Sequence, residues 1–166
     1  MLFGVPLHPM TIHFPIVLFL TGTLALLISL FKEKTFFITA AYYIYGLGIL
    51  AGGIAILSGR AQAALIAHNE TIHEMMELHE TLAYLFVGLM AVLFIWMYIR
   101  KNLLKKAEHI MLIIFAFSIA GLLAYQSHIG GRMVYQEGAG VKPMEKVLEQ
   151  GHDHNHTHGE EPTHEH

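Results

Sequence analysis

Histidine is the residue type in this sequence whose number and spacing could support chemistry. The chain has 166 residues, of which 13 are histidines, as many as its aspartates and glutamates together. A neutral imidazole is the commonest side-chain ligand for iron, copper and zinc. The sequence has no cysteine, which excludes disulfides, thiolate metal sites and a covalently attached c-type haem. We therefore expect imidazoles to hold any metal or cofactor.

The elements that must position these histidines are four apolar segments. Hydrophobic residues make up 54% of the chain and charged residues 14%, which leaves too little polar surface for a water-soluble globule of this size. Each segment is close to the roughly 20 residues that cross about 30 Å of hydrocarbon. The segments are apolar on every side, which excludes a β-barrel. We predict an all-α integral membrane protein, a four-transmembrane-helix bundle with spans near 12–31, 35–58, 80–100 and 108–127.

The segments outside these spans differ in composition. Residues 58–81 are rich in helix formers and predict a polar outer helix between the second and third spans, which runs into the third span. We assign residues 1–141 to the membrane domain, 142–150 to a short amphipathic segment and 151–166 to a disordered His-rich tail. The first ten residues have no positive charge, unlike a cleaved signal peptide, so we expect the first span to be retained.

The basic residues predict the orientation. The first and third connections carry six of the ten lysines and arginines, whereas the second carries only Arg60. Short basic loops stay in the cytoplasm, so both termini and residues 58–81 should lie outside it. The net charge of -3 excludes a basic nucleic-acid binder. The six basic loop residues are Lys32, Lys34, Arg100, Lys101, Lys105 and Lys106.

With this orientation, six of the seven histidines before the tail fall at the outer ends of the spans. Ionisable groups at membrane depth are candidates for function. The alternative is that these histidines are interfacial or solvated residues without a ligand role. This alternative is strongest for His68 and His73, which are only weak candidates for metal ligands. The seventh, His109, should begin the last span in contact with water. The six outer histidines are His8, His13, His68, His73, His79 and His128.

Two helical faces continue from these histidines. In the third span the face through His79 runs on to Phe86 and Met90, and in the fourth the face through His128 runs back to Gly121 and Phe117. Small residues beside a histidine could leave room for a flat macrocycle, although ordinary helix packing explains them equally well. Glu77 and Glu80 are candidates to orient a ligand imidazole.

The tail is a separate feature. Its histidines alternate with Asp, Asn and Thr, which suits a flexible chain that binds Zn²⁺, Ni²⁺ or Cu²⁺ adaptively rather than a fixed helical site. No nucleophile elbow, P-loop or dinucleotide fingerprint is present, so hydrolase and nucleotide-dependent activities have no support. The tail histidines are His152, His154, His156, His158, His164 and His166.

A resemblance follows from three stretches. Residues 7–15 (LHPMTIHFP), a histidine at position 79 and residues 127–135 (SHIGGRMVY) resemble the signature of a bacterial four-helix membrane family, domain of unknown function family 2231. The resemblance covers roughly residues 5–141 and matches His8, His13, His79 and His128 to the family's characteristic histidines. Ser127 stands where glycine is usual, and Glu137 stands where a further histidine is frequent.

The family is similar in helix count and histidine placement to the transmembrane b-type cytochromes, which implies haem b. Only the outer end has a full set of histidines, so at most one haem is expected. We predict His13 and His79 as axial ligands, His128 as the next candidate and His8 as a contact to a propionate or to a ligand. Two axial imidazoles leave no open iron position, which favours electron transfer over oxygen chemistry.

Three hypotheses remain at this point. The leading one is electron transfer through one haem in a bacterial inner membrane, with a redox partner protein or a quinone. The second is handling of Cu, Zn or Ni ions by the histidine cluster and the tail. The third is a structural or assembly subunit with interfacial histidines. Enzymatic activity is uncertain and disfavoured, and a homo-oligomer is left open.

Overall fold

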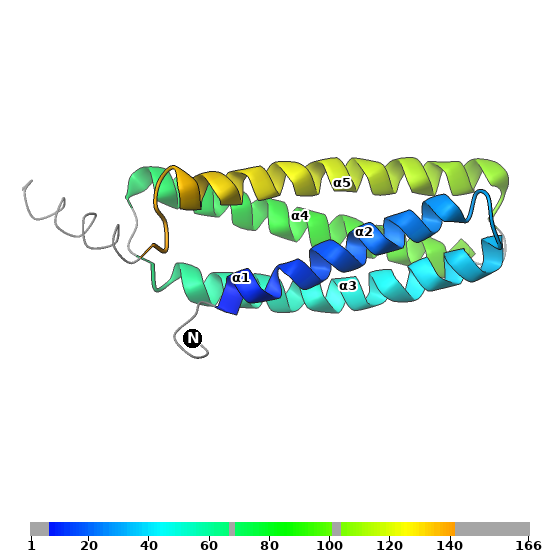
Figure 1. Ribbon diagram of the computed structural model, residues 1–166, viewed down its shortest axis with the longest axis horizontal. Helices are drawn as coiled ribbons and strands as arrows, with labels where there is room; N and C mark the ends of the chain where they lie inside the picture. Colours follow the sequence, from blue (N-terminus) through cyan, green and yellow to red (C-terminus); the bar gives the residue numbers. More distant parts are fainter. Residues whose placement is uncertain (1–6, 67–68, 101–103, 142–166) are drawn as a thin grey trace, which may run out of the picture.

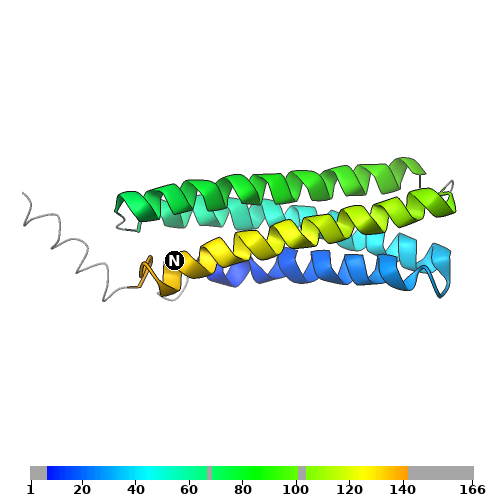
Figure 2. The same ribbon diagram turned by 90° about the horizontal axis from the view of Figure 1, so that it is seen from above.

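The computed structural model describes residues 7–66, 69–100 and 104–141, and these ranges form helices and no strand. A one-turn helix, α1, precedes four long helices that lie side by side as an up-and-down bundle (Figures 1 and 2). All four spans are long and apolar enough to cross a membrane, with α1 and α2 forming the first. The predicted all-α four-helix membrane architecture is confirmed. The elements are α1 Leu7–Thr11, α2 His13–Ile28, α3 Lys34–Ala63, α4 Glu70–Arg100 and α5 Lys106–Tyr135.

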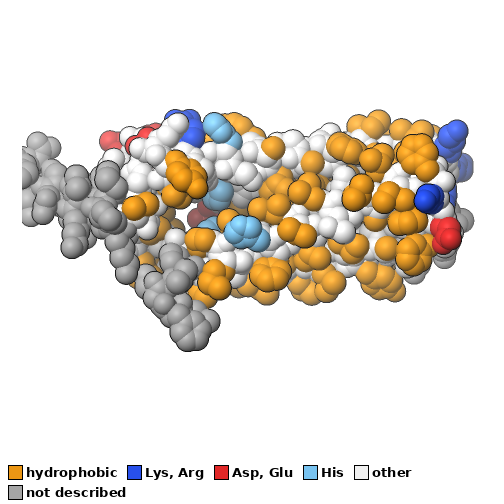
Figure 3. Space-filling view, viewed as in Figure 1, with side chains coloured by type: hydrophobic (Ala, Val, Ile, Leu, Met, Phe, Trp, Pro, Cys, Tyr) orange, Lys and Arg blue, Asp and Glu red, His pale blue; other side chains and the backbone are white. Residues whose placement is uncertain are grey.

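The two ends of the bundle differ in composition. We call the end where α1 and α4 begin and α3 and α5 end the histidine end; it carries His8, His73, His79 and His128. The opposite end, with Lys32, Lys34, Arg100, Lys105 and Lys106, is the basic end. Figure 3 shows histidine side chains on the half of the rod that carries α1, and lysine and arginine side chains gathered at the opposite tip.

The core is apolar and aromatic. Phe19 of α2 packs edge-on against Phe86 of α4, with ring centroids 5.2 Å apart, and against Tyr45 of α3 at 5.8 Å. Tyr45 is fully buried, and its hydroxyl lies 3.1 Å from that of Thr23. Large apolar side chains such as Leu57 also cover the outer surface, as expected for helices whose outward faces contact lipid.

The helix of the first span is interrupted near its start, four residues before a proline. Helix α1 ends at Thr11 and α2 begins at His13. Pro15 has no N–H to donate to the Thr11 carbonyl, which weakens the helix at that turn. The Thr11 hydroxyl instead donates to the His8 carbonyl at 3.0 Å and lies 2.8 Å from the Ser58 hydroxyl of α3. Hydrogen bonds from Thr11 and His8 to α3 hold α1 against the end of that helix.

The polar helix predicted over residues 58–81 is confirmed where it runs into the third span, since residues 70–81 open α4, but it does not extend back to residue 58. Residues up to Ala63 continue α3, the chain turns at 64–66, and α4 begins at Glu70. A helix that crossed this stretch unbroken would carry α4 away from the bundle, so packing of the two apolar spans decides the turn. Beyond α5, Gly138 and Gly140 adopt positive φ angles of 71° and 74°, the left-handed conformation that glycine favours after a helix end.

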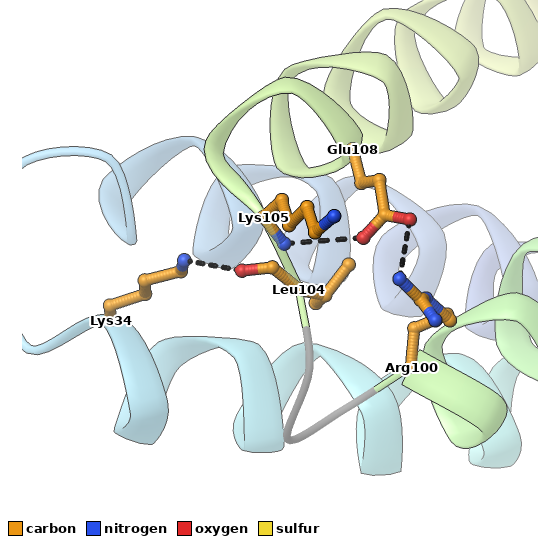
Figure 4. Close-up of polar contacts among 5 residues, drawn as sticks. All are labelled: Lys34, Arg100, Leu104, Lys105 and Glu108. Carbon is orange, nitrogen blue, oxygen red and sulfur yellow. Dashed lines mark hydrogen bonds and ion pairs between the residues drawn. The ribbon is translucent and has the colours of Figure 1, made fainter.

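Polar contacts fasten the basic end (Figure 4). Glu108 accepts a hydrogen bond from the Lys105 backbone N–H at 3.2 Å, which caps the start of α5. Its other carboxylate oxygen accepts from Arg100 Nη2 at 2.7 Å, which ties α5 to the end of α4. Lys34 Nζ donates to the Leu104 carbonyl at 3.1 Å and links the start of α3 to the same region.

Candidate functional site

Burial divides the histidines of the bundle into two groups. His8 and His79 are partly buried between helices, whereas His13, His73 and His128 are exposed. The structure therefore partly buries two of the four histidines predicted to bind a cofactor, at one end of the bundle, and leaves His13 and His128 on the surface. His68 and the six tail histidines lie outside the described residues.

His8 of α1 is anchored on α3. Its Nδ1 lies 3.0 Å from the backbone carbonyl oxygen of Ala55 and 3.3 Å from the hydroxyl of Ser58. A carbonyl oxygen can only accept, so Nδ1 carries the proton and donates it. The neutral ring then has its lone pair on Nε2, the nitrogen through which an imidazole could bind a metal.

His79 of α4 is anchored in the same way on α5. Its Nδ1 lies 3.1 Å from the backbone carbonyl oxygen of Gln126, so this ring also carries its proton on Nδ1 and its lone pair on Nε2. His79 and His8 lie toward the starts of their helices, α4 and α1, at the same end of the bundle. Two helix pairs thus present imidazoles in the same tautomer at the same end of the bundle.

Each ring lies against a glycine. A Cβ atom placed on Gly59 of α3 would be 2.9 Å from Cε1 of His8, and one placed on Gly130 of α5 would be 3.0 Å from Cε1 of His79. Carbon atoms do not approach this closely without displacement. The absence of a side chain at both positions is therefore part of the geometry that seats the rings.

Gln126 adds an unfilled acceptor. Its side chain is 9% exposed, and its Oε1 has no hydrogen-bond donor within the described ranges. Buried polar atoms normally have a partner in the protein, in ordered water or in a ligand. The residue that anchors His79 through its backbone thus also leaves an acceptor for a bound group.

The helical period explains why His128 is not part of this pair. Gln126 and Gly130 are four residues apart and face His79, whereas His128 lies two residues from each, which is more than half a turn around α5. The face predicted through His128 is exposed, with Phe117 51% exposed and open space at Gly121. The matching face on α4, through Phe86 and Met90, is buried.

Two carboxylates of α4 pair with basic groups, one on α4 itself and one on α3. His73 Nε2 lies 3.4 Å from Glu77, and Arg60 Nε lies 3.4 Å from Glu80. His79 is oriented by a backbone carbonyl rather than by the predicted carboxylates. Within the described ranges, no group of three or more histidines and carboxylates could hold a metal ion.

His109 at the basic end is bound differently. It is 3% exposed, so the prediction that it contacts water is wrong. The Ser29 hydroxyl donates to the Leu26 carbonyl at 2.6 Å and therefore accepts from Nε2–H of His109 at 2.7 Å. A signal for this burial was in the sequence, because Leu112, Ile113 and Ala116 continue the His109 face at helical spacing and are buried.

Other residues of the site were missed by sequence reasoning. Ser58, Gly59 and Gly130 touch the rings, and Ala55 and Gln126 supply the backbone carbonyls. Backbone acceptors have no sequence signature. The adjacent glycines Gly130 and Gly131 formed part of a recognised motif, but the sequence did not indicate which one faces a histidine.

Comparison with known proteins gives one finding. A family model described as "Predicted membrane protein (DUF2231)" matches residues 4–143, a range that includes all five helices and both anchored histidines. No curated protein and no solved structure matches the chain significantly.

Proposed function

This chain belongs to the family of predicted membrane proteins described as DUF2231, and we propose that it binds one b-type haem at its histidine end and transfers electrons. The observation that carries the proposal is the common state of His8 and His79. Each donates Nδ1–H to a backbone carbonyl of another helix and keeps a lone pair on Nε2. Imidazoles that bind metals almost always donate their other ring N–H in this manner.

The donor set suits a haem better than a bare ion. A haem takes two axial ligands from the protein, whereas a structural zinc ion takes four, and the described residues bring together two anchored imidazoles. The unfilled Gln126 Oε1 offers a further contact to a bound group. A haem held by His8 and His79 would supply one-electron transfer.

The burial of the rings favours a particular axial pair. His8 is held between α1 and α3 by its Nδ1, whereas His13 is exposed. We assign the axial roles to His8 and His79, in place of the His13 and His79 pair that the sequence favoured. The Ala55 and Gln126 carbonyls fix the orientation of the rings and make Nε2 more basic.

We place the histidine end outside the cytoplasm of a bacterial inner membrane. The basic end carries five described lysines and arginines, whereas α4 begins at the histidine end with Glu70, Glu74, Glu77 and Glu80. The excess of basic residues in short loops marks the cytoplasmic side. An electron partner, either a redox protein or a quinone, would then approach from the outer side or from the bilayer.

The test is an optical spectrum of the full chain, purified in mild detergent from haem-replete cells, before and after reduction with dithionite. We expect a Soret band that sharpens on reduction, with resolved α and β bands. His8→Ala and His79→Ala should each abolish this spectrum, whereas the exposed His73→Ala is the matched control. If the haem spectrum is lost in His13→Ala but kept in His8→Ala, the ligands are His13 and His79. A wild-type protein without visible absorption bands would overturn the haem proposal.

Metal analysis of the same samples separates the remaining classes. A colourless protein that binds Cu, Zn or Ni in proportion to its intact histidines would indicate metal handling, with the tail as the expected site of capture. Neither haem nor metal would indicate a structural or assembly role, in which the two imidazoles serve only to join helices.

A further inference from the structure

The two anchored histidines share a spacing rule. His8 donates to the carbonyl of Ala55, and four residues later on α3 stands Gly59. His79 donates to the carbonyl of Gln126, and four residues later on α5 stands Gly130. In both cases the imidazole of one helix bonds a backbone carbonyl of another helix, and the residue whose N–H bonds the same carbonyl within that helix is a glycine.

This spacing has a physical reason. In an α-helix the N–H of residue n+4 bonds the carbonyl of residue n, and the side chain at n+4 leans back over that carbonyl. The same chain shows the effect directly. The hydroxyl of Thr23 bonds the carbonyl of Phe19 at 2.9 Å, and that of Ser118 bonds the carbonyl of Ile114 at 3.0 Å. An imidazole from another helix can take that place only when residue n+4 has no side chain.

The contacts at both glycines fit this reasoning. A Cβ on Gly59 would lie 3.1 Å from Nδ1 of His8, and one on Gly130 would lie 3.4 Å from Nδ1 of His79, each with the still closer contact to Cε1. The glycines at 22, 46, 48 and 52 are crowded by aromatic, methionine or valine side chains instead. Among the described glycines, 59 and 130 are those that face a histidine.

We propose that Gly59 and Gly130 are positioning residues, which let His8 and His79 reach a backbone carbonyl and thereby keep the proton on Nδ1 and the lone pair on Nε2. A methyl group at either position crowds Cε1 of the ring, and we expect the resulting shift of the ring to disrupt the bond that selects this tautomer. The importance of that tautomer for haem rests on the proposed function. The anchoring itself does not, and it can be measured without any cofactor.

The experiment uses the full chain in detergent, labelled with ¹⁵N-histidine and prepared without haem. Imidazole ¹⁵N shifts distinguish a protonated nitrogen from one with a lone pair, and His8→Ala and His79→Ala assign the two signals. We expect Nδ1–H in both rings of the wild type. Gly130→Ala should change the signal of His79 alone, and Gly59→Ala that of His8 alone.

The controls are glycines in open space. Gly131 is adjacent to Gly130, and Gly53 lies on the same helix as Gly59; a Cβ on either would meet nothing within 4 Å. Gly131→Ala and Gly53→Ala should leave both tautomers unchanged. Retention of Nδ1–H on His79 in Gly130→Ala, or an equal change in Gly131→Ala, would overturn the proposal.

A double-mutant cycle covers the case in which a variant folds poorly. Gly130→Ala should lower the midpoint of thermal unfolding by more than about 4 °C in the wild type, and by less than half as much in the His79→Ala background, where no ring is displaced. An equal loss in both backgrounds would mean that the glycine serves helix packing alone, which contradicts the proposal.

The haem-loaded protein gives a separate readout. If the proposed function holds, Gly130→Ala should weaken haem retention by about 10- to 100-fold, the usual effect of losing the partner that orients a metal-bound imidazole, whereas Gly131→Ala should not. If the wild-type protein binds no haem, the proposed function is wrong, but the ¹⁵N measurement of the histidine tautomers still tests the role of the glycines. Normal haem retention in a Gly130→Ala variant with altered apo tautomer would overturn the link between the two.

Discussion

The two ends of the bundle use histidine in opposite ways. At the histidine end, His8 and His79 donate through Nδ1 to backbone carbonyls and keep Nε2 for another partner. At the basic end, His109 uses Nε2 itself to bond the Ser29 hydroxyl and is 3% exposed. The same side chain is thus a candidate ligand at one end and part of a buried joint between α2 and α5 at the other.

This difference shows that burial alone does not mark a functional histidine. His109 is the most buried histidine of the described chain, yet its hydrogen bonds are satisfied within the protein. What separates the ends is the acceptor that each ring meets. The Ser29 hydroxyl accepts a hydrogen bond from Nε2 of His109. The backbone carbonyls that stand four residues before a glycine accept from Nδ1 of His8 and His79, and leave Nε2 of each ring available.

The largest effect should come from removing a ring at each end. His79→Gly should abolish haem binding because an axial ligand is lost, and imidazole added to the buffer should restore part of the low-spin spectrum by occupying the vacated space. His109→Gly should keep its haem per folded molecule, with or without imidazole. The optical spectrum measures both, and equal haem loss in the two variants would erase the distinction between the ends.

The next effect concerns the side of the membrane on which each end lies. The chain has no cysteine, so Glu137→Cys at the histidine end and Glu33→Cys at the basic end each introduce a single thiol. In intact cells, an impermeant maleimide should label Glu137→Cys and leave Glu33→Cys unlabelled until the membrane is opened. The reverse pattern would invert the orientation proposed from the basic residues.

A smaller effect is expected at the buried joint. Ser29→Ala should destabilise the protein by about 1–3 kcal/mol, because it leaves the buried Nε2–H of His109 without an acceptor. Haem content should stay at the wild-type level. Thermal unfolding in detergent measures the loss, and Ser118→Ala is the matched control because that serine is exposed and bonds its own helix. A loss no larger than that of the control would argue against the Ser29–His109 bond.

The smallest effect belongs to the ion pair at the basic end. Glu108→Gln should lower the unfolding free energy by less than Ser29→Ala does, since it removes only a partly exposed ion pair with Arg100 and weakens the cap of α5. Added salt should reduce the difference between variant and wild type, because it screens the ion pair. A difference that does not depend on salt would assign the effect to the cap alone.

Much of the fold could be predicted from local sequence. The four spans follow from uncharged apolar runs, and the break before His13 follows from Pro15. The interruption between α3 and α4 was not predicted from the helix formers of residues 58–81, although one local signal was present. The Asn69 side chain accepts a hydrogen bond from the backbone N–H of Ile72 at 2.9 Å and caps the start of α4. The packing of the two spans against each other fixes where the chain turns.

The candidate site was predicted in part. The sequence indicated that several histidines lie at one end, and it named both His8 and His79. It favoured His13 over His8 because His13 lies at the predicted end of the span, but which of the two turns inward depends on their rotation about the helix axis. The bonds that fix this rotation join residues 47 positions apart in both cases, beyond the reach of any local pattern.

The sequence by itself thus determined that the protein is a four-span membrane bundle and that histidines gather at one of its ends, because hydropathy and loop charge act locally along the chain. The tertiary structure decided which histidines turn inward, which ring nitrogen stays free and which glycine makes room for it. Those properties depend on how each helix is rotated against its neighbours, and that rotation is set by packing between distant residues.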